Sequence, residues 1–537
     1  AGDAIAGPEV VGGVANLVAK SLISADVGGA TMRYRLLDTT RAYAIAKLRD
    51  GEGPARASRA HAEFYRDLLD RARAEWARRS TDEWLALYRQ EVDNIRAALD
   101  WAFSAGGDPA VGVALSAAAA VLLFDLGQLH ACVANAERAL DVIEAEPGRD
   151  LHNEMRLRSA LGAAAVYARG PGEAIDAAWS RALDLAAGLG EADYEARALW
   201  GLWNARLYGG SPRLALGFAE RFHDLAARRG ETAQRLMGER VIAISKHYLG
   251  EQDEARRRLE AMLSQYEPDR HRWHTAGFRV DHRIVGRANL ARILWLQGTP
   301  DQALGLAQGA LADAQALGHV MTLQYVLSEA AIPLALLVGD LDAAGHLIAL
   351  LLDLASRHGF VIWEAWGRCC EAIRLVRSTG AGLPELQAAV GALRQTGFEA
   401  HTTFILGVLA EALCDAGEIE AGSTAIEDGL ARCEAHEDRW CQSELLRVKG
   451  RLAWARGSIA MAEESFWSAL AWARRQGAVS WELRAAMGLA QLWSQGGRVA
   501  EAHELLFSIH GRFTEGHGTQ DLRTARAWIS TLRSRLD

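Results

Sequence analysis

The stretch LQGTPDQALGLA, Leu296 to Ala307, decides the fold, because it has the pattern of a helix end, a glycine turn at Gly298 and a new helix. Alanine follows the turn glycine five residues later. Near the C-terminus, SQGGRVAEAHELL (Ser494–Leu506) repeats the arrangement. A repeated pattern without a shared reactive group indicates a structural unit, not a catalytic motif.

The turn glycine recurs about every forty residues, a period typical of helical repeats. Most of these glycines are followed by alanine four or five residues later, and a small residue such as Ala291, Ala410 or Gly450 often lies seven residues before. The series is Gly127, Gly170, Gly209, Gly250, Gly298, Gly339, Gly380, Gly417, Gly457 and Gly497. Small side chains allow two antiparallel helices to approach closely, and glycine permits the tight reversal. One hairpin cannot bury its apolar stripe alone, so stacked hairpins are expected.

These features predict an all-α protein: a right-handed superhelical solenoid of about ten hairpins that resemble tetratricopeptide repeats, with a longer period than usual. Residues 51–106 are expected to form a helical linker, residues 107–515 the solenoid, and residues 516–537 a C-terminal capping helix. A single small β-hairpin is expected near residues 22–36, with its turn at the paired glycines 28–29.

Composition excludes several classes of protein. Half of the 537 residues are hydrophobic and 24% are charged, which is typical of a globular chain. The net charge of −9 provides no basic excess for nucleic acid. The six cysteines lack the spacing of a disulfide framework or metal site and are expected to be reduced core thiols. No signal peptide or apolar run of membrane-spanning length is visible, so a cytoplasmic location without membrane contact is expected. Because AGDAIAGPEV opens the chain without methionine, we expect a piece of a longer protein.

Two regions resemble a family of bacterial signal-transduction ATPases. RYRLLDTTRAYAIAKL (Arg33–Leu48) and EVDNIRAALDWA (Glu91–Ala102) are similar to the region after the nucleotide-binding module of that family, and RWCQSELLRVKGRLAWARG (Arg439–Gly457) is similar to its C-terminal tail. Its members often carry an OmpR-type winged-helix DNA-binding domain. The resemblance implies that residues 1–50 are part of a separate winged helix. It also implies that an upstream module binds ATP or ADP, and that this chain contacts the regulator's own ATPase and DNA-binding domains and joins an oligomer on activation.

No cofactor or catalytic activity is predicted for this chain itself. The segment GGVANLVAKS (Gly12–Ser21) contains Lys20 but no glycine directly before it, so its backbone is not expected to cradle a phosphate. Hydrolase and zinc-protease motifs are absent from the sequence. His271, His274 and His282 have an HxxH element that could bind zinc, but nothing completes a tetrahedral ligand set. A solvated loop or helix extension is expected there.

The candidate ligand-binding residues follow from the phase of the repeat. In this repeat class the first helix of each hairpin lines the concave surface, and positions about three and six residues before the turn glycine are expected to be exposed there. Arginine and tryptophan are frequent at these positions: Trp203, Arg206, Arg292, Trp295, Arg374, Arg377, Arg451 and Trp454. Such a groove suits an anionic or aromatic ligand, or an acidic peptide. Replacing exposed arginines such as Arg292 or Arg451 with alanine is expected to leave folding almost intact.

Two functions remain open from the sequence. The chain could be a sensor that binds a small-molecule effector, or a protein or peptide partner, and relays occupancy to the ATPase and DNA-binding parts of a transcriptional regulator. Alternatively, it could be a structural scaffold or autoinhibitory arm without its own ligand, with tryptophans filling gaps between helices and arginines merely solvated.

Overall fold

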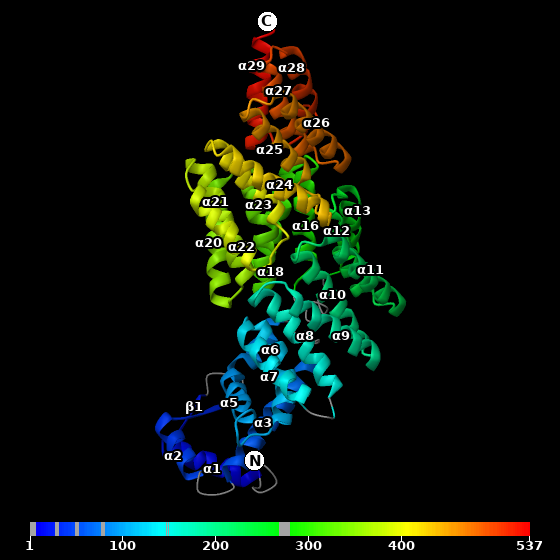
Figure 1. The fold of residues 1–537 in the computed structure, drawn as a ribbon. Helices are drawn as coiled ribbons and strands as arrows, with labels where there is room; N and C mark the ends of the chain where they lie inside the picture. The colour runs from blue at the N-terminus through cyan, green and yellow to red at the C-terminus, as the bar shows by residue number, and fades with distance from the viewer. Residues whose placement is uncertain are drawn as a thin grey trace.

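The computed structural model describes residues 7–26, 32–48, 53–76, 81–145, 148, 150–267 and 280–537. The helices form an elongated stack with the N-terminus at one end and the C-terminus at the other (Figure 1). The N-terminal part consists of α1 (Gly7–Ala19), β1 (Ile23–Asp26), β2 (Arg33–Leu36) and α2 (Asp38–Leu48). The two strands are antiparallel, and within the described residues they form the only sheet. The β-hairpin predicted near residues 22–36 is therefore confirmed, while its glycine turn lies outside the described residues. The winged-helix identity stays a prediction.

The next segment consists of helices that continue the core of the repeats: α3 (Gly53–Trp76), α4 (Thr81–Tyr88), η1 (Arg89–Glu91) and α5 (Val92–Ala102). Helix α3 packs against both α5 and the first repeat helix. The buried Trp84 indole donates a hydrogen bond to the carbonyl of Ala72 at 2.8 Å, which fixes α4 on α3. Arg33 reaches Glu91 at 2.6 Å and so ties the β-hairpin to this segment.

The described chain then forms ten helical hairpins and a final helix, which confirms the predicted solenoid. The first helices of the hairpins are α6 (Pro109–Asp125), α8 (Leu151–Ala168), α10 (Ala192–Tyr208), α12 (Thr232–Tyr248), α16 (His282–Leu296), the composite α18 (Val320–Val326), η3 (Leu327–Ala331) and α19 (Ile332–Val338), α21 (Val361–Thr379), α23 (Thr402–Asp415), α25 (Gln442–Ala455) and α27 (Val479–Gln495). The second helices are α7 (Leu129–Ala145), α9 (Glu173–Leu189), α11 (Pro212–Arg229), α13 (Gln252–Gln265), α17 (Pro300–Leu317), α20 (Leu341–His358), α22 (Leu383–Gln395), α24 (Ile419–His436), α26 (Ile459–Gln476) and α28 (Val499–His510), and α29 (Gln520–Ser534) ends the stack.

The turn glycines are needed for their backbone conformation. Nine of the ten predicted glycines have a positive φ, for example 88° at Gly298. The exception is Gly209, where the following Gly210 takes the left-handed conformation with φ 74°. This correction places the turn midway between Gly170 and Gly250, so the period is more regular than the sequence suggested. A side chain at such positions would be strained.

One first helix is interrupted by a π-helical turn. Residues Val320–Val338 run through α18, η3 and α19, and Pro333 lies just after the π turn. Proline has no N–H to bond the carbonyl four residues earlier, and the wider turn accommodates this loss. Among the described helices this is the one that is long and apolar enough to cross a membrane. However, 83% of its apolar stretch is buried inside the fold, as in a core helix.

Consecutive turns of the superhelix are in direct contact, and we call this contact the closure of the superhelix. The backbone N–H of Glu399 donates to the carbonyl of Tyr208 at 2.7 Å, and that of Arg439 donates to the carbonyl of Tyr248 at 2.8 Å. Side-chain contacts of the same kind join residues 185 to 224 positions apart in the sequence. The concave sides of the first helices therefore face another layer of protein, and these helices are buried on nearly all sides.

Candidate ligand cavity

The structure brings together three of the eight candidate residues. Arg292, Trp295 and Arg377 line one cavity, and the other five do not line it. Those five are each engaged elsewhere: Trp203 donates to Ser245, Arg206 pairs with Asp176, Arg374 pairs with Glu371, Arg451 pairs with Glu411 and Asp415, and Trp454 packs in the C-terminal core. The expectation of one cavity that also holds Arg374, Arg451 and Trp454 is wrong.

The expected exposure is also wrong for part of the set. Arg292 is 6% exposed, and Trp203 and Trp295 are each 3% exposed. The repeat phase placed these side chains on the concave surface, but at Arg292 and Trp295 that surface is covered by Trp440 and Trp481 of the next superhelical turn. Consequently, replacing Arg292 with alanine cannot be expected to leave folding intact.

The cavity lies between two superhelical turns. Its free volume is about 530 Å³ when the space that is open to solvent is counted. Only about 20 Å³ of it is open to the centre of a water molecule, so the cavity is a narrow slot. Helices α12, α16, α19, α21 and α23 and the loop before α25 form it. The lining residues are His247, Arg292, Trp295, Leu296, Pro333, Leu336, Leu337, Trp366, Ile373, Arg377, His401, Phe404 and Trp440.

A buried charge cluster lies beside the slot. Glu329, in the π turn, accepts hydrogen bonds from Arg292 at 2.8 Å and from the Tyr248 hydroxyl at 3.4 Å, and its other oxygen is 3.1 Å from His401 Nε2. Burial alone would raise the pKa of Glu329, but His401 and Arg292 outweigh it and lower the pKa. Burial would likewise lower the pKa of Arg292, yet Tyr248 and Glu329 raise it. Both side chains of the Arg292–Glu329 pair are therefore ionised, and their charges cancel.

Aromatic rings form much of the wall. Trp366 and His401 stack with their centroids 4.3 Å apart, and the Arg292 guanidinium lies 5.1 Å from the Trp440 ring. Phe404 packs 5.5 Å from Trp440. The Trp366 indole N–H donates to the Ser328 carbonyl at 3.0 Å, which fixes its ring against the π turn. These faces suit a flat apolar group.

Two lining residues have an unsatisfied polar atom within the described part of the chain, and a third, Arg377, has no ion pair there. Arg377 donates to the Leu336 carbonyl at 2.6 Å, and burial, followed by repulsion from Arg484, lowers its pKa against the attraction of Glu411, Asp521 and Glu444. Burial, followed by Arg292, lowers the pKa of His247 to about 3, so its ring is neutral. His247 Nδ1 lies 2.7 Å from the Gln252 side-chain oxygen and therefore carries the proton. This leaves His247 Nε2 as an acceptor without a partner, and the Trp440 indole N–H as a donor without one.

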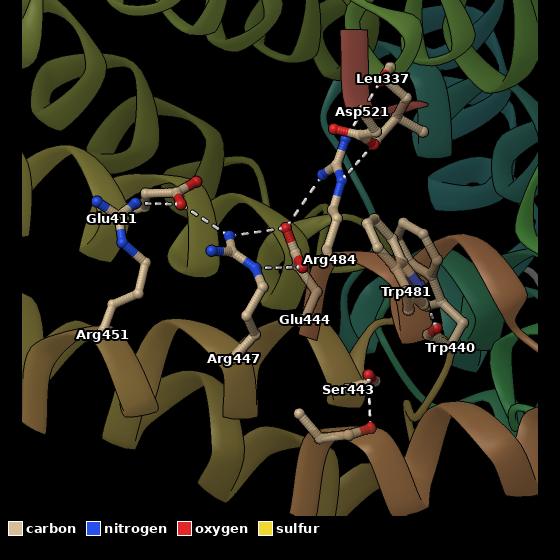
Figure 2. Close-up of polar contacts among 11 residues, drawn as sticks. Leu337, Glu411, Trp440, Ser443, Glu444, Arg447, Arg451, Trp481, Arg484 and Asp521 are labelled. Carbon is tan, nitrogen blue, oxygen red and sulfur yellow. Dashed lines mark hydrogen bonds and ion pairs between the residues drawn. The ribbon is translucent and has the colours of Figure 1, made fainter. Parts of the chain in front are cut away.

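A ladder of ion pairs crosses the C-terminal repeats next to the slot (Figure 2). Its bonds run from Arg451 and Arg447 to Glu411, from Arg447 and Arg484 to Glu444, and from Arg484 to Asp521 and the Leu337 carbonyl. Burial opposes the charged form of Glu411, but the two arginines outweigh it and lower its pKa. The charge of Arg451 is therefore already satisfied inside the protein.

Sequence reasoning missed the lining residues Trp366, His401 and Trp440, and it missed Tyr248 and Glu329 of the charge cluster beside the slot. One signal was present. VLSEAAIPLALLV (Val326–Val338) carries a single glutamate and a proline inside an apolar run, and a lone buried carboxylate needs a cation. The aromatic partners come from the next superhelical turn and have no local signal.

Of the three histidines that the sequence singled out, His282 is the one that lies within residues 280–537 of the described structure. His271 and His274 lie outside the described residues. His282 is buried at the start of α16 and accepts a hydrogen bond from Arg240 at 3.1 Å, so a solvated position is wrong for this residue. No group of three metal-ligating side chains occurs among the described residues. The six cysteines are free, and five of them are buried, including Cys369, whose pKa burial raises to about 12.

Comparisons with known proteins identify no family. No family model matches the chain, and no curated protein matches it. Among solved structures, a Rap protein complexed with competence and sporulation factor is similar over 71% of this chain and 99% of its own, with 13% identity and a TM-score of 0.48. Aspartyl phosphate phosphatase F from Bacillus subtilis is similar over 70% and 95%, with 10% identity and a TM-score of 0.40. Yeast Tom70 covers 88% of this chain and 97% of its own, with 14% identity and a TM-score of 0.30. These scores carry no argument about function.

Proposed function

We propose that this chain is the sensor module of a bacterial transcriptional regulator of the signal-transduction ATPase type, and that a small-molecule effector binds in the slot between two superhelical turns. The strongest support is that the residues that line the slot come from two superhelical turns. Trp295 and Leu336 come from one turn, whereas His401 and Trp440 come from the next. A ligand that contacts both turns binds more tightly in one relative position of the turns than in another, and so shifts that equilibrium.

The remaining parts of the proposal follow from the resemblance to signal-transduction ATPases. The chain has no catalytic role, and ATP or ADP binds in an upstream module. Its partners are the effector and the regulator's own ATPase and DNA-binding domains, within a cytoplasmic protein that oligomerises on activation. Neither DNA nor a membrane contacts this chain directly.

A protein-interaction scaffold without its own ligand is the second candidate. The observation that favours it is the narrowness of the slot, in which only about 20 Å³ is open to the centre of a water molecule. In this case the only role of the ion pairs and of the contacts between turns is to make the solenoid rigid.

A cavity-filling substitution separates the two functions. Ile373 lines the slot, and Leu375 lies on the same helix but does not. A library of small metabolites is screened for compounds that raise the melting temperature of the chain, and hits are repeated on Ile373→Trp and Leu375→Trp. A ligand at a hundred times its Kd stabilises the folded state by about 2.7 kcal/mol. The sensor function requires a hit that is lost in Ile373→Trp and kept in Leu375→Trp. No hit, or hits unaffected by Ile373→Trp, would leave the scaffold function.

A further inference from the structure

The slot has an excess of positive charge. Two arginines and no carboxylate line it. Arg292 is neutralised by Glu329 at 2.8 Å, whereas Arg377 forms no ion pair among the described residues, and its only direct acceptor there is the Leu336 carbonyl; Glu411, Asp521 and Glu444 act on it from farther away. A cation held at an apolar wall without a counter-ion is costly, and an anionic group in the slot removes that cost.

The remaining lining defines the rest of the ligand. Nine of the thirteen lining residues are apolar or aromatic, namely Trp295, Leu296, Pro333, Leu336, Leu337, Trp366, Ile373, Phe404 and Trp440. The narrow shape of the slot admits a flat group more readily than a bulky one. The unpartnered Trp440 indole N–H and the neutral His247 Nε2 offer one donor and one acceptor.

Resting on the proposed sensor function, we propose that the effector is a small aromatic monocarboxylate. Its carboxylate pairs with Arg377, and its ring lies between the indole faces that line the slot. A single negative charge matches the one lining arginine that forms no ion pair among the described residues. A dianion would place its second charge against apolar side chains, and a neutral ring would leave Arg377 unpaired.

The test compares acids with their carboxamides, which have nearly the same shape but no charge. Benzoate, phenylacetate, indole-3-acetate and 2-naphthoate are titrated into the full chain by isothermal titration calorimetry, each beside its carboxamide. At least one acid is expected to bind, and its carboxamide is expected to bind about ten- to a hundredfold more weakly, as for loss of one charge-assisted contact. Acetate, which has the charge without the ring, is expected not to bind measurably.

The structure provides a matched pair of variants. Arg377→Gln removes the lining cation that forms no ion pair, whereas Arg374→Gln removes an arginine one turn earlier on α21 that is paired with Glu371 outside the slot. Arg377→Gln should weaken the acid to the level of its carboxamide. Arg374→Gln should leave the affinity unchanged, and Arg377→Lys should restore part of it. Melting curves check that each variant is folded, and the acid–amide comparison needs no variant.

Three results would overturn the proposal: no acid of the panel binds, acid and carboxamide bind equally, or Arg377→Gln binds the acid like the wild type. These outcomes are distinct from failure of the sensor function. If the metabolite screen yields an uncharged compound whose effect Ile373→Trp abolishes, the sensor function stands and only the ligand class is wrong.

Discussion

Arg292 and Glu329 form the buried ion pair beside the slot. Each is almost fully buried, and Glu329 also accepts from Tyr248 and contacts His401. The sequence pattern proposed Arg292 as a groove residue, and its side chain lines the cavity. The pattern could not show that the side chain is buried, because Trp440, which lies against it, follows more than a hundred positions later.

Replacing Arg292 with alanine should lower the free energy of unfolding by about 3–5 kcal/mol, because it leaves the Glu329 carboxylate buried without its cation. Urea unfolding followed by tryptophan fluorescence measures the loss. Arg374→Ala is the control, since its ion pair with Glu371 is partly exposed and worth at most about 1 kcal/mol. The double variant Arg292→Met/Glu329→Leu should be more stable than Arg292→Ala. Equal stability of Arg292→Ala and wild type would mean that the pair does not support the fold.

Asp438 predicts a specific dependence of stability on pH. Burial raises its pKa to about 7, against the hydrogen bond from Thr403 and the charge of Arg292, which lower it. The folded state therefore holds the proton more tightly than the unfolded state, whose value is 3.8. Stability from this group is complete below about pH 4 and is lost as the pH rises to about 7.

Between pH 5 and pH 8, Asp438 should reduce the free energy of unfolding by about 3 kcal/mol. The measurement is the difference in urea stability between wild type and Asp438→Asn at both values, because the asparagine cannot titrate. Parallel pH profiles of the two proteins would contradict the raised pKa.

At the scale of neighbouring elements, aromatic side chains pack between the glycines of two successive first helices. An added Cβ at Gly450 in α25 would lie 2.9 Å from the Phe466 ring, and one at Gly488 in α27 would lie 2.6 Å from it. Trp179 occupies the same kind of place between Gly162 and Gly201. Of these four glycines, only Gly450 lies seven residues before its turn glycine, the position that the sequence pattern marked as a close helix approach. The other three lie eight or nine residues before theirs.

Gly488→Ala should destabilise the C-terminal repeats by about 1–3 kcal/mol through overpacking against the fully buried Phe466. The control is Gly217→Ala on the exposed face of α11, where an added Cβ meets nothing within 4 Å. That change should stabilise by about 0.5–1 kcal/mol, since alanine is the better helix former. Differential scanning calorimetry compares the two variants, and opposite signs of the melting shift are expected. A shift of the same sign in both would show that the ring yields to the new methyl group.

At the same scale, the π turn shows why part of the site escaped prediction. Its cause, Pro333, is visible in the sequence, but the helical period predicts a regular helix through Glu329. The wider turn changes the direction of the residues that follow it. Which side chains then reach the slot depends on that geometry and not on spacing.

For the molecule as a whole, the hairpins, their turns and the terminal β-hairpin could be predicted, because each depends on residues close together in the sequence. The closure of the superhelix could not. It depends on pairs such as Tyr208 with Glu399 and Trp295 with Ser480, whose sequence context contains nothing to mark them as partners. This closure is what buries Trp295 and Arg292, which lie against Trp481 and Trp440 of the next turn.

Deleting one internal repeat, Asp340–Gly380, should damage the protein far more than removing Gln520–Asp537. The internal deletion mismatches two neighbouring interfaces and also shifts the pairing of superhelical turns by one repeat. Removal of α29 mainly uncovers α27 and α28. Circular dichroism and limited proteolysis of both variants provide the comparison. A cooperative, protease-resistant internal deletion would indicate that contacts between turns contribute little.

The contact between turns also sets an order in time for a chain leaving the ribosome. The Trp295 carbonyl receives its bond from Ser480, 185 residues later. At about 5–20 residues per second, synthesis of that partner takes about 10–40 s. During this interval the inner wall of the nascent solenoid, with its tryptophans and the Arg292–Glu329 pair, faces water with no second layer over it. Translation speed and chaperone supply therefore matter most for this inner wall, which stays uncovered until the next superhelical turn has been made.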